Sequence, residues 1–309
     1  MKENVKKVIR SGIRGLKHKF NSYFLKEYSL VILLYHRISP NNEENRLGTV
    51  LNKEVFKKQM QFLKDRYEIT TLKECFAEEK NVSKNLRVAI TFDDGYVDNF
   101  KYAFPILKEL DISATFFLAT NYINSGKPIW DQHFQIILDQ NKQALSIEDP
   151  QNNFLLERGP DLKDDVKFLW EAINYLRFIS PVRRQEILYP ILNLSDKKID
   201  LSLDRCLSWD EINIMKKDGM DFGSHGCSHS SLINLSEKEM LFEVSESKKV
   251  LESKLSEECL FFALPFGSQL DFDEKVLKEV KNTGYLRCLL NIRGNNFTDS
   301  DQFSLKRKS

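Results

Sequence analysis

The segment Arg87-Val-Ala-Ile-Thr-Phe-Asp-Asp-Gly-Tyr96 places two adjacent carboxylates directly after a run of apolar residues. The near-continuous hydrophobicity of Arg87–Phe92 is typical of a parallel strand covered on both faces. Asp93 and Asp94 then fall at its carboxyl end, where barrel enzymes build their active sites. Asp-Gly is also a common turn dipeptide. The preceding strand favours a functional site, because two carboxylates placed together away from water need a metal or a cationic partner.

The same alternation of short apolar runs and helical patterns extends outward on both sides of this segment. Further strands are expected at residues 30–35, 114–118, 220–223, 260–264 and 285–290. Helices are expected between them at residues 53–67, 99–110, 208–218, 236–255 and 273–282. Capping boxes open two of these helices, at Ser208 and Ser236. The pattern predicts an α/β fold whose parallel sheet closes, fully or partly, into a barrel.

The stretch from about residue 140 to residue 203 interrupts this rhythm. It offers helical patterns near residues 164–178 and 181–192 and a turn at Gly159-Pro160, but no clear strand. No linker rich in Pro, Gly or Ser separates it from its surroundings. We therefore expect a helical insertion within a single domain at residues 28–309.

A second strand-like run leads into the segment Gly223-Ser-His-Gly-Cys-Ser-His229. Two of the five histidines stand here four residues apart, and in a helix that spacing puts both imidazoles on one face, close enough to share a metal. Two unrelated polar histidines are the alternative, but a chance pair directly after a strand is less attractive. A peptidase site of the His-Glu-x-x-His type is disfavoured, because position 226 is glycine and supplies no base.

The aspartate pair and the histidine pair together predict a hydrolytic metal site. Two histidines and one aspartate leave coordination positions open for water and substrate. The neighbouring aspartate is then available to take a proton from water.

These motifs resemble the polysaccharide deacetylase family with the NodB homology domain. Thr91-Phe-Asp-Asp-Gly95 is followed by His225-x-x-x-His229 and then by Leu264-Pro-Phe-Gly267, in the family's order. The resemblance covers residues 30 to 290, with the insertion as the least matched part. It implies a distorted (β/α)₇ barrel at residues 28–309 and removal of N- or O-acetyl groups from glycans with a divalent metal, often Zn²⁺.

Carried over by position, the resemblance makes Asp93 the catalytic base. The implied metal ligands are Asp94, His225 and His229. Pro265 and Phe266 match the motif that lines the substrate groove, where the amide after the proline helps to hold the oxyanion. Alone, Leu264-Pro-Phe-Gly267 would also fit a plain turn at the end of a strand.

Two departures from the family pattern concern the catalytic machinery. Many members place an arginine that orients the base two residues before the proline, and here that position is Ala263. Many also place a histidine general acid near the C-terminus, but no histidine follows His229. Leu34-Tyr-His-Arg37 resembles a Tyr-His segment found early in a permuted subset. Because the first and last strands of a closed barrel are neighbours, we expect His36 to be the general acid, with a structural histidine as an equal alternative.

Trp130-Asp131 resembles a pair often seen after the third strand in related biosynthetic deacetylases. This similarity suggests Trp130 as a substrate contact that stacks on a sugar. An aromatic residue that opens a helix is more often part of the core, and that alternative stays open.

Residues 1–27 carry eight basic side chains against two acidic ones, and their apolar residues recur at spacings of three and four. The pattern predicts a basic amphipathic helix, packed either on the protein or on an anionic membrane surface. No secretory signal is visible and the five cysteines form no close pair, so we expect a cytoplasmic protein, peripheral at the inner membrane face if the helix binds lipid.

The leading functional hypothesis is a metal-dependent hydrolase that removes acetyl groups, N-acetyl first, from a poly- or oligosaccharide or a lipid-linked glycan. The total of 46 basic against 45 acidic residues gives no electrostatic reason to expect nucleic acid as a partner. Two alternatives remain: an amidase acting on a small non-glycan C–N bond, and a carbohydrate-binding protein with impaired turnover, which the missing arginine would fit.

Overall fold

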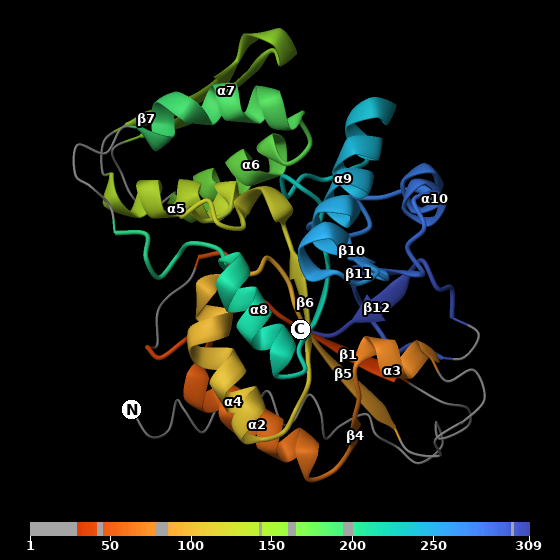
Figure 1. The fold of residues 1–309 in the computed structure, drawn as a ribbon. Coiled ribbons are helices and arrows are strands. Elements are labelled where there is room, and N and C mark those ends of the chain that lie inside the picture. Colours follow the sequence, from red (N-terminus) through yellow and green to blue (C-terminus); the bar gives the residue numbers. More distant parts are fainter. Residues whose placement is uncertain are drawn as a thin grey trace.

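The computed structural model describes residues 30–41, 46–77, 86–141, 144–159, 165–193, 200–297 and 300–309. The helix expected at residues 1–27 lies outside these ranges. Within them, a mostly parallel sheet curls almost completely into a barrel with helices around it (Figure 1). The α/β barrel expected from the alternating sequence pattern is therefore confirmed.

Seven strands follow one another around the described wall of the barrel, and each pairs in parallel with the next. In spatial order they are β1 (Leu30–Tyr35), β5 (Arg87–Phe92), β6 (Thr115–Leu118), β9 (Asp221–Ser224), β10 (Phe261–Ala263), β11 (Arg287–Arg293) and β12 (Leu305–Arg307). The short strand β4 (Glu68–Ile69) also pairs with β5, and β2 (Arg37–Ser39) pairs with β3 (Val50–Asn52) apart from the wall.

The last strand closes the barrel against the first. The amide of Lys308 donates to the carbonyl of Ile32 at 2.9 Å, and the amide of Leu34 donates to the carbonyl of Lys308 at 2.8 Å. Strand β12 was not among the strands expected from the sequence. It has three residues, of which only Leu305 is apolar, so its extended form comes from backbone pairing with distant strands rather than from its own composition.

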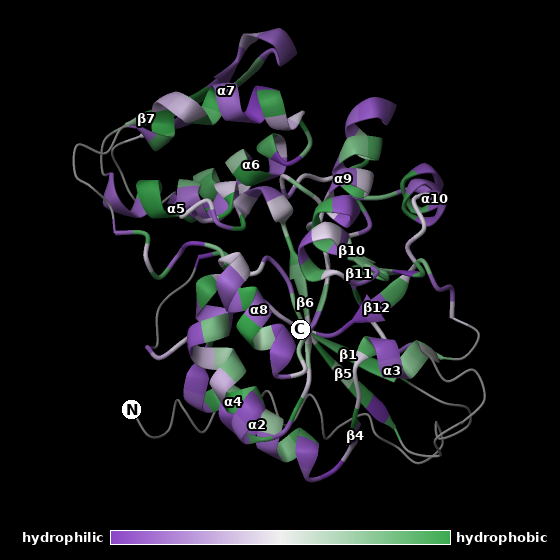
Figure 2. Cartoon of the chain, in the orientation of Figure 1, coloured by the Kyte–Doolittle hydropathy of each residue, from purple (hydrophilic) through white to green (hydrophobic). Residues whose placement is uncertain are grey.

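Large apolar side chains fill the space between the wall and the surrounding helices. Phe92 and Phe116, on neighbouring strands, are fully buried and stack with ring centroids 4.8 Å apart. The hydropathy colours show most strands of the barrel wall as mainly apolar, with β12 as an exception, and the helices as mixed (Figure 2). Burial of each such side chain contributes about 1.5–3 kcal/mol, so this core holds the strand ends in place.

The helices that surround the barrel begin mostly where the sequence signals predict. They are α2 (Lys53–Lys64), α3 (Leu72–Ala77), α4 (Phe104–Glu109), α8 (Trp209–Lys217), α9 (Glu237–Leu255) and α10 (Glu274–Asn282). A short π-helical segment, Asn99–Ala103, leads into α4. The reciprocal capping boxes at Ser208 and Ser236 are both formed. Among the described residues, we find no helix with the length and apolarity needed to cross a membrane.

The insertion lies at the top of Figure 1, beside α9. It contains α6 (Asp165–Leu176) and α7 (Pro181–Leu192), so the two helices expected there are confirmed, and α5 (Trp130–Gln140) leads into it. The expectation of no strand was wrong, because β7 (Leu145–Asp149) and β8 (Phe154–Arg158) form an antiparallel hairpin. Strand β7 alternates buried and exposed residues over only five positions, so its period-2 signal is short.

Candidate metal and catalytic site

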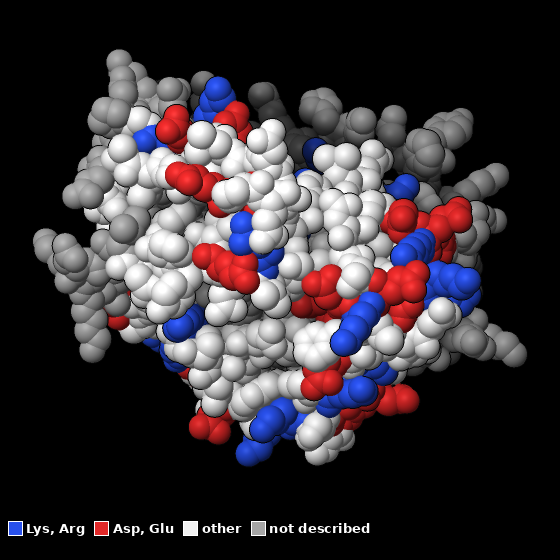
Figure 3. Space-filling model, turned by 90° about the horizontal axis from the view of Figure 1, so that it is seen from above, with Lys and Arg blue, Asp and Glu red and all other residues white. Residues whose placement is uncertain are grey.

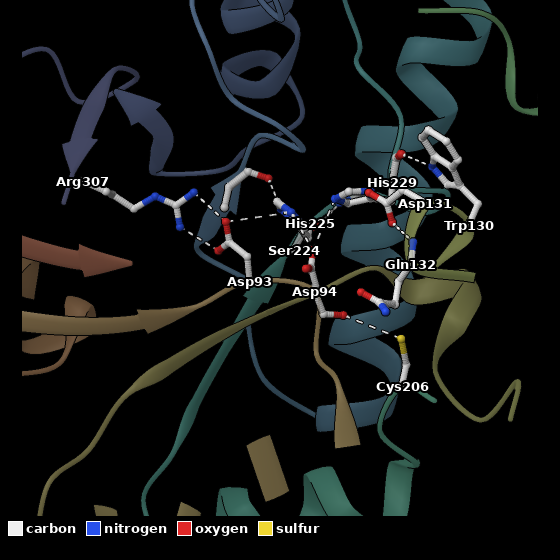
Figure 4. Close-up of polar contacts among 12 residues, drawn as sticks. Asp93, Asp94, Trp130, Asp131, Gln132, Cys206, Ser224, His225, His229 and Arg307 are labelled. Atoms are coloured by element: carbon white, nitrogen blue, oxygen red, sulfur yellow. Dashed lines mark hydrogen bonds and ion pairs between the residues drawn. The ribbon is translucent and has the colours of Figure 1, made fainter. Parts of the chain in front are cut away.

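The predicted site residues meet at the carboxyl ends of the strands. Asp93 and Asp94 follow β5, while His225 and His229 follow β9. The amide of Asp93 donates to the carbonyl of Tyr35 at 3.0 Å, which ties the aspartate turn to the end of β1. Figure 4 shows the two aspartates between Arg307 on one side and His229 on the other.

Asp94 and the two histidines form a compact, buried set of possible metal ligands. One ligand atom from each lies within 4.8 Å of the others. The Oδ1 atom of Asp94 is 3.5 Å from Nε2 of His225 and 3.3 Å from Nε2 of His229. This oxygen is buried and has no hydrogen-bond partner within the described ranges. A buried carboxylate oxygen facing two imidazole nitrogens fits a divalent metal, since two histidines and one carboxylate are a usual catalytic zinc donor set.

The main chain fixes the orientation of His225. Its Nδ1 atom lies 2.8 Å from the carbonyl oxygen of Ala263, so Nδ1 carries the proton and donates it. The lone pair is then on Nε2, which faces Asp94. Ala263, which stands where many family members have an arginine, thus helps to orient His225 through its backbone carbonyl.

The segment that carries the two histidines is a loop, so the helical geometry considered for it was wrong. Gly226 and His229 have φ angles of +74° and +52°, in the left-handed region. The two rings nevertheless stand 5.2 Å apart between centroids. The loop turns back on itself, and this brings the imidazoles together without a helix.

The electrostatics of Asp94 favour its ionised form. Burial raises the pKa of this carboxyl, but contacts with His225 and His229 outweigh that effect and hold the pKa well below its usual value. The carboxylate is therefore ionised at neutral pH, as a metal ligand must be.

Asp93 faces a different partner, the guanidinium of Arg307 on β12. Nη1 of Arg307 donates to Oδ1 at 2.6 Å, and Nη2 donates to Oδ2 at 2.7 Å, with both side chains buried. Burial raises the pKa of Asp93, but the charge of Arg307 and then His225 outweigh it, so the pKa is lowered. Many family members orient the base with an arginine at the position of Ala263. In this chain Arg307 is placed to orient Asp93 instead.

Arg307 was not among the site residues predicted from the sequence. It lies 214 positions from Asp93, and the family motif that supplies such an arginine stands elsewhere in the chain. The one local signal was Leu305 two residues before Arg307, in a run of three basic residues, and such a pattern carries no specific meaning. Only the closure of the barrel by β12 brings the two residues together.

His36 lies at the end of β1, directly after the residue that binds the amide of Asp93. Its carbonyl accepts a 2.7 Å hydrogen bond from Nδ2 of Asn99, which fixes the backbone there. Burial lowers the pKa of the imidazole, while the charges of Asp94 and Asp93 act in the opposite direction. The role of His36 as the general acid stays a prediction.

The predicted substrate-contacting residues pack around His229. The Phe266 ring lies 4.8 Å from the His229 ring, and Pro265 is buried beside Gly226. Trp130 is only 5% exposed, and its indole nitrogen donates to the carbonyl of His229 at 2.9 Å. Trp130 therefore supports the histidine loop from inside the protein, as the core alternative implies. Direct stacking of a sugar on it stays a prediction that this burial does not favour.

Residues 80–287 match the family model for polysaccharide deacetylases. YxkH of Bacillus subtilis, assigned to the polysaccharide deacetylases, is 23% identical over 91% of this chain and 71% of its own length. Poly-β-1,6-N-acetyl-D-glucosamine N-deacetylase of Staphylococcus epidermidis is 28% identical over 63% of this chain and 71% of its own length.

Solved structures share the fold. The deacetylase PplD of Streptococcus pyogenes, in complex with acetate, superposes with a TM-score of 0.60 at 19% identity over 92% of each chain. The family is metal-dependent in general, and this chain has an Asp/His/His site of the matching kind. The family model covers 208 of the 309 residues, counted from 80 through 287. The chain belongs to the polysaccharide deacetylase family and is a deacetylase, a hydrolase that acts on carbon–nitrogen bonds.

Proposed function

We propose that the chain removes N-acetyl groups from amino sugars in a poly- or oligosaccharide, with a zinc ion held by Asp94, His225 and His229. The observation that carries this proposal is that the two adjacent aspartates face different partners. Asp94 faces the two histidines, while Asp93 faces Arg307 in a bidentate contact. One carboxylate is thus available as a ligand and its neighbour as a base.

Each residue has a defined part in the proposed hydrolysis. Asp93 accepts a proton from the attacking water, whose oxygen bonds to the acetyl carbon. His36 gives a proton to the sugar nitrogen as the C–N bond breaks, and the products are acetate and a free amine. A divalent ion at this site supplies a Lewis acid that polarises the acetyl oxygen and favours ionisation of water. The amide of Phe266 is proposed as a further donor to the developing oxyanion.

Two observations support a working enzyme over a binding protein with impaired turnover. The missing arginine was the main argument for impairment, and Arg307 now stands in its place against Asp93. The N-deacetylase of Staphylococcus epidermidis, the relative with the higher identity, acts on a polymer of N-acetylglucosamine according to its name. We therefore propose β-1,6-linked N-acetylglucosamine oligomers as the first substrate to test.

Acetate release from these oligomers tests the proposal. The purified protein should release acetate, lose this activity with a chelator and regain it when Zn²⁺ is added. Asp93→Asn should lower the rate by about 10²–10⁴-fold, because the base is lost. The same variant should still bind Zn²⁺. Binding of the oligomer without acetate release at any Zn²⁺ loading would sink the proposal.

A further inference from the structure

The loop that carries His229 is held from outside the barrel by Arg184, on helix α7 of the insertion. Arg184 is only 3% exposed. Its Nη2 atom donates to the carbonyl of Ser228 at 2.9 Å and to Oγ of Ser230 at 2.9 Å. The guanidinium therefore binds the residue before His229 and the residue after it.

The backbone of His229 needs such support. Its φ of +52° is unfavourable for a residue with a side chain, at a cost of order 1–3 kcal/mol. A conformation of this kind persists only when surrounding contacts impose it. The Trp130 indole binds the carbonyl of His229 itself, and Glu243 on α9 accepts hydrogen bonds from the amides of Cys227 and Ser228 at 2.8 and 2.9 Å.

The burial of the Arg184 guanidinium is energetically unfavourable, because a cation loses its hydration there. No carboxylate within the described residues forms an ion pair with it, and its Nη1 atom is buried without a hydrogen-bond partner there. Its other contacts are with Oγ of Ser228, 3.5 Å from Nη2, and with the ring of Trp130, 4.6 Å from the guanidinium carbon. Burial of an unpaired cation costs more than burial of an apolar side chain. Arg184 is thus not expected to stabilise the folded state on balance. Its contacts are better explained by the conformation that they impose on the loop with His229.

We propose that Arg184 is a positioning residue for the metal ligand His229, and that the insertion is the outer support of the metal site. This inference rests on the proposed zinc site. The guanidinium holds the two residues that flank His229, the indole of Trp130 holds its carbonyl, and Nε2 of His229 is thereby kept 3.3 Å from Oδ1 of Asp94. Arg184 acts through the loop and does not bind the metal itself.

Titration of the metal-free, full-length protein with Zn²⁺ against a coloured chelator tests this role. Arg184→Met should raise the Kd for Zn²⁺ by about 10–100-fold, the loss typical when a residue that orients a metal ligand is removed. Arg183→Met is the matched control. Arg183 is the adjacent residue on the same helix, but it binds Asp149 of β7 at 2.7 Å and Glu186 at 2.8 Å, away from the loop. Its Kd should stay within about twofold of the wild type, although both variants are expected to loosen the insertion.

A milder variant covers the case in which Arg184→Met does not fold. Ser230→Ala removes one acceptor of the guanidinium and leaves α7 unchanged, so it should weaken Zn²⁺ binding severalfold while the melting temperature of the metal-free protein stays near that of the wild type. Wild-type protein that binds no Zn²⁺ would overturn the proposed metal site. Wild-type binding with an unchanged Kd in Ser230→Ala, and in Arg184→Met if it folds, would overturn the positioning role alone.

Discussion

The adjacent residues Asp93 and Asp94 have opposite surroundings because of the backbone between them. Asp94 has a φ of +76°, so the chain turns sharply at that residue. One carboxylate then meets the guanidinium of Arg307 and the other meets the histidines. The motif predicted both aspartates and both histidines as site residues from the sequence. It did not predict Arg307, because no local pattern links residues that meet only through barrel closure.

Replacement of Arg307 should move the acid limb of the activity profile. In Arg307→Gln, burial still raises the pKa of Asp93 but the opposing charge is gone, so Asp93 becomes protonated at higher pH. Since an opposite charge at this range lowers a carboxyl pKa by about 1–3 units, the acid limb of kcat/KM should rise by at least about one pH unit. The measurement is acetate release across pH 4 to 9. An acid limb that stays in place would show that Asp93 is not the base or that Arg307 does not govern its pKa.

His36→Ala tests the proposed acid at the basic limb. A protonated imidazole is the active form of a general acid, so activity falls as pH rises through its pKa, and burial lowers that pKa in His36. The activity of the wild type should therefore begin to fall at a lower pH than it would if the acid were an exposed histidine with an ordinary pKa. The variant should be slower by about 10²-fold or more and lack this limb. An unchanged rate and basic limb would leave His36 as a structural residue.

At the scale of elements, six of the seven strands along the described barrel wall and most helices were predictable, because their own residues specify them. Strand β5 is an unbroken apolar run, and α9 opens with a capping box that the structure contains. Strand β12 and the β7–β8 hairpin were not predictable in this way. Their extended form depends on partners far away in the chain or on a short alternation among charged residues.

The turn after β10 offers a test at this scale. Gly267 has a φ of +61°, and a Cβ there would lie 2.8 Å from the amide nitrogen of Asn291 and 2.9 Å from the carbonyl oxygen of Leu264. Gly267→Ala should therefore lower the free energy of unfolding by about 2–3 kcal/mol, from strain plus backbone displacement. Urea unfolding measures this change.

Gly48→Ala is the matched control for that turn. Its φ is +69°, but a Cβ there would meet nothing within 4 Å. It should cost only the strain of the left-handed backbone, about 1 kcal/mol. Equal losses in the two variants would mean that the turn after β10 yields easily and does not hold Phe266 in place.

For the whole molecule, metal binding should raise the melting temperature. A ligand that binds only the folded state stabilises it by about 2.7 kcal/mol at one hundred times its Kd. For a chain of 309 residues that corresponds to about 4 °C, and the Asp94→Asn variant should lose most of the shift. A thermal scan with and without Zn²⁺ checks this. A wild-type shift retained in full by Asp94→Asn would place the metal elsewhere.

The relation of the whole protein to a membrane is a separate proposal. The basic pattern of residues 1–27 and the deacetylase fold together suggest action on a lipid-linked glycan at the inner leaflet. On the face shown in Figure 3, acidic and basic side chains of the described residues are interspersed among uncharged ones, so that face offers no broad basic field for a charged surface. We propose that binding to anionic membranes depends on residues 1–27.

Liposome sedimentation tests this dependence. Full-length protein should sediment with vesicles containing anionic phospholipid and not with neutral ones, and removal of residues 1–27 should abolish the association. Acetate release from a soluble oligomer should be unaffected by the deletion. Equal sedimentation with and without residues 1–27 would contradict the proposal.

The barrel closure that joins Arg307 to Asp93 also has a consequence for synthesis of the protein. The ribosome makes both aspartates and both histidines well before β12, so a nascent chain holds every proposed metal ligand while the partner of its base is still untranslated. On the proposed roles, the set of metal ligands is complete before Arg307 can contact Asp93, so we expect metal binding to precede turnover, which needs residue 307 outside the exit tunnel.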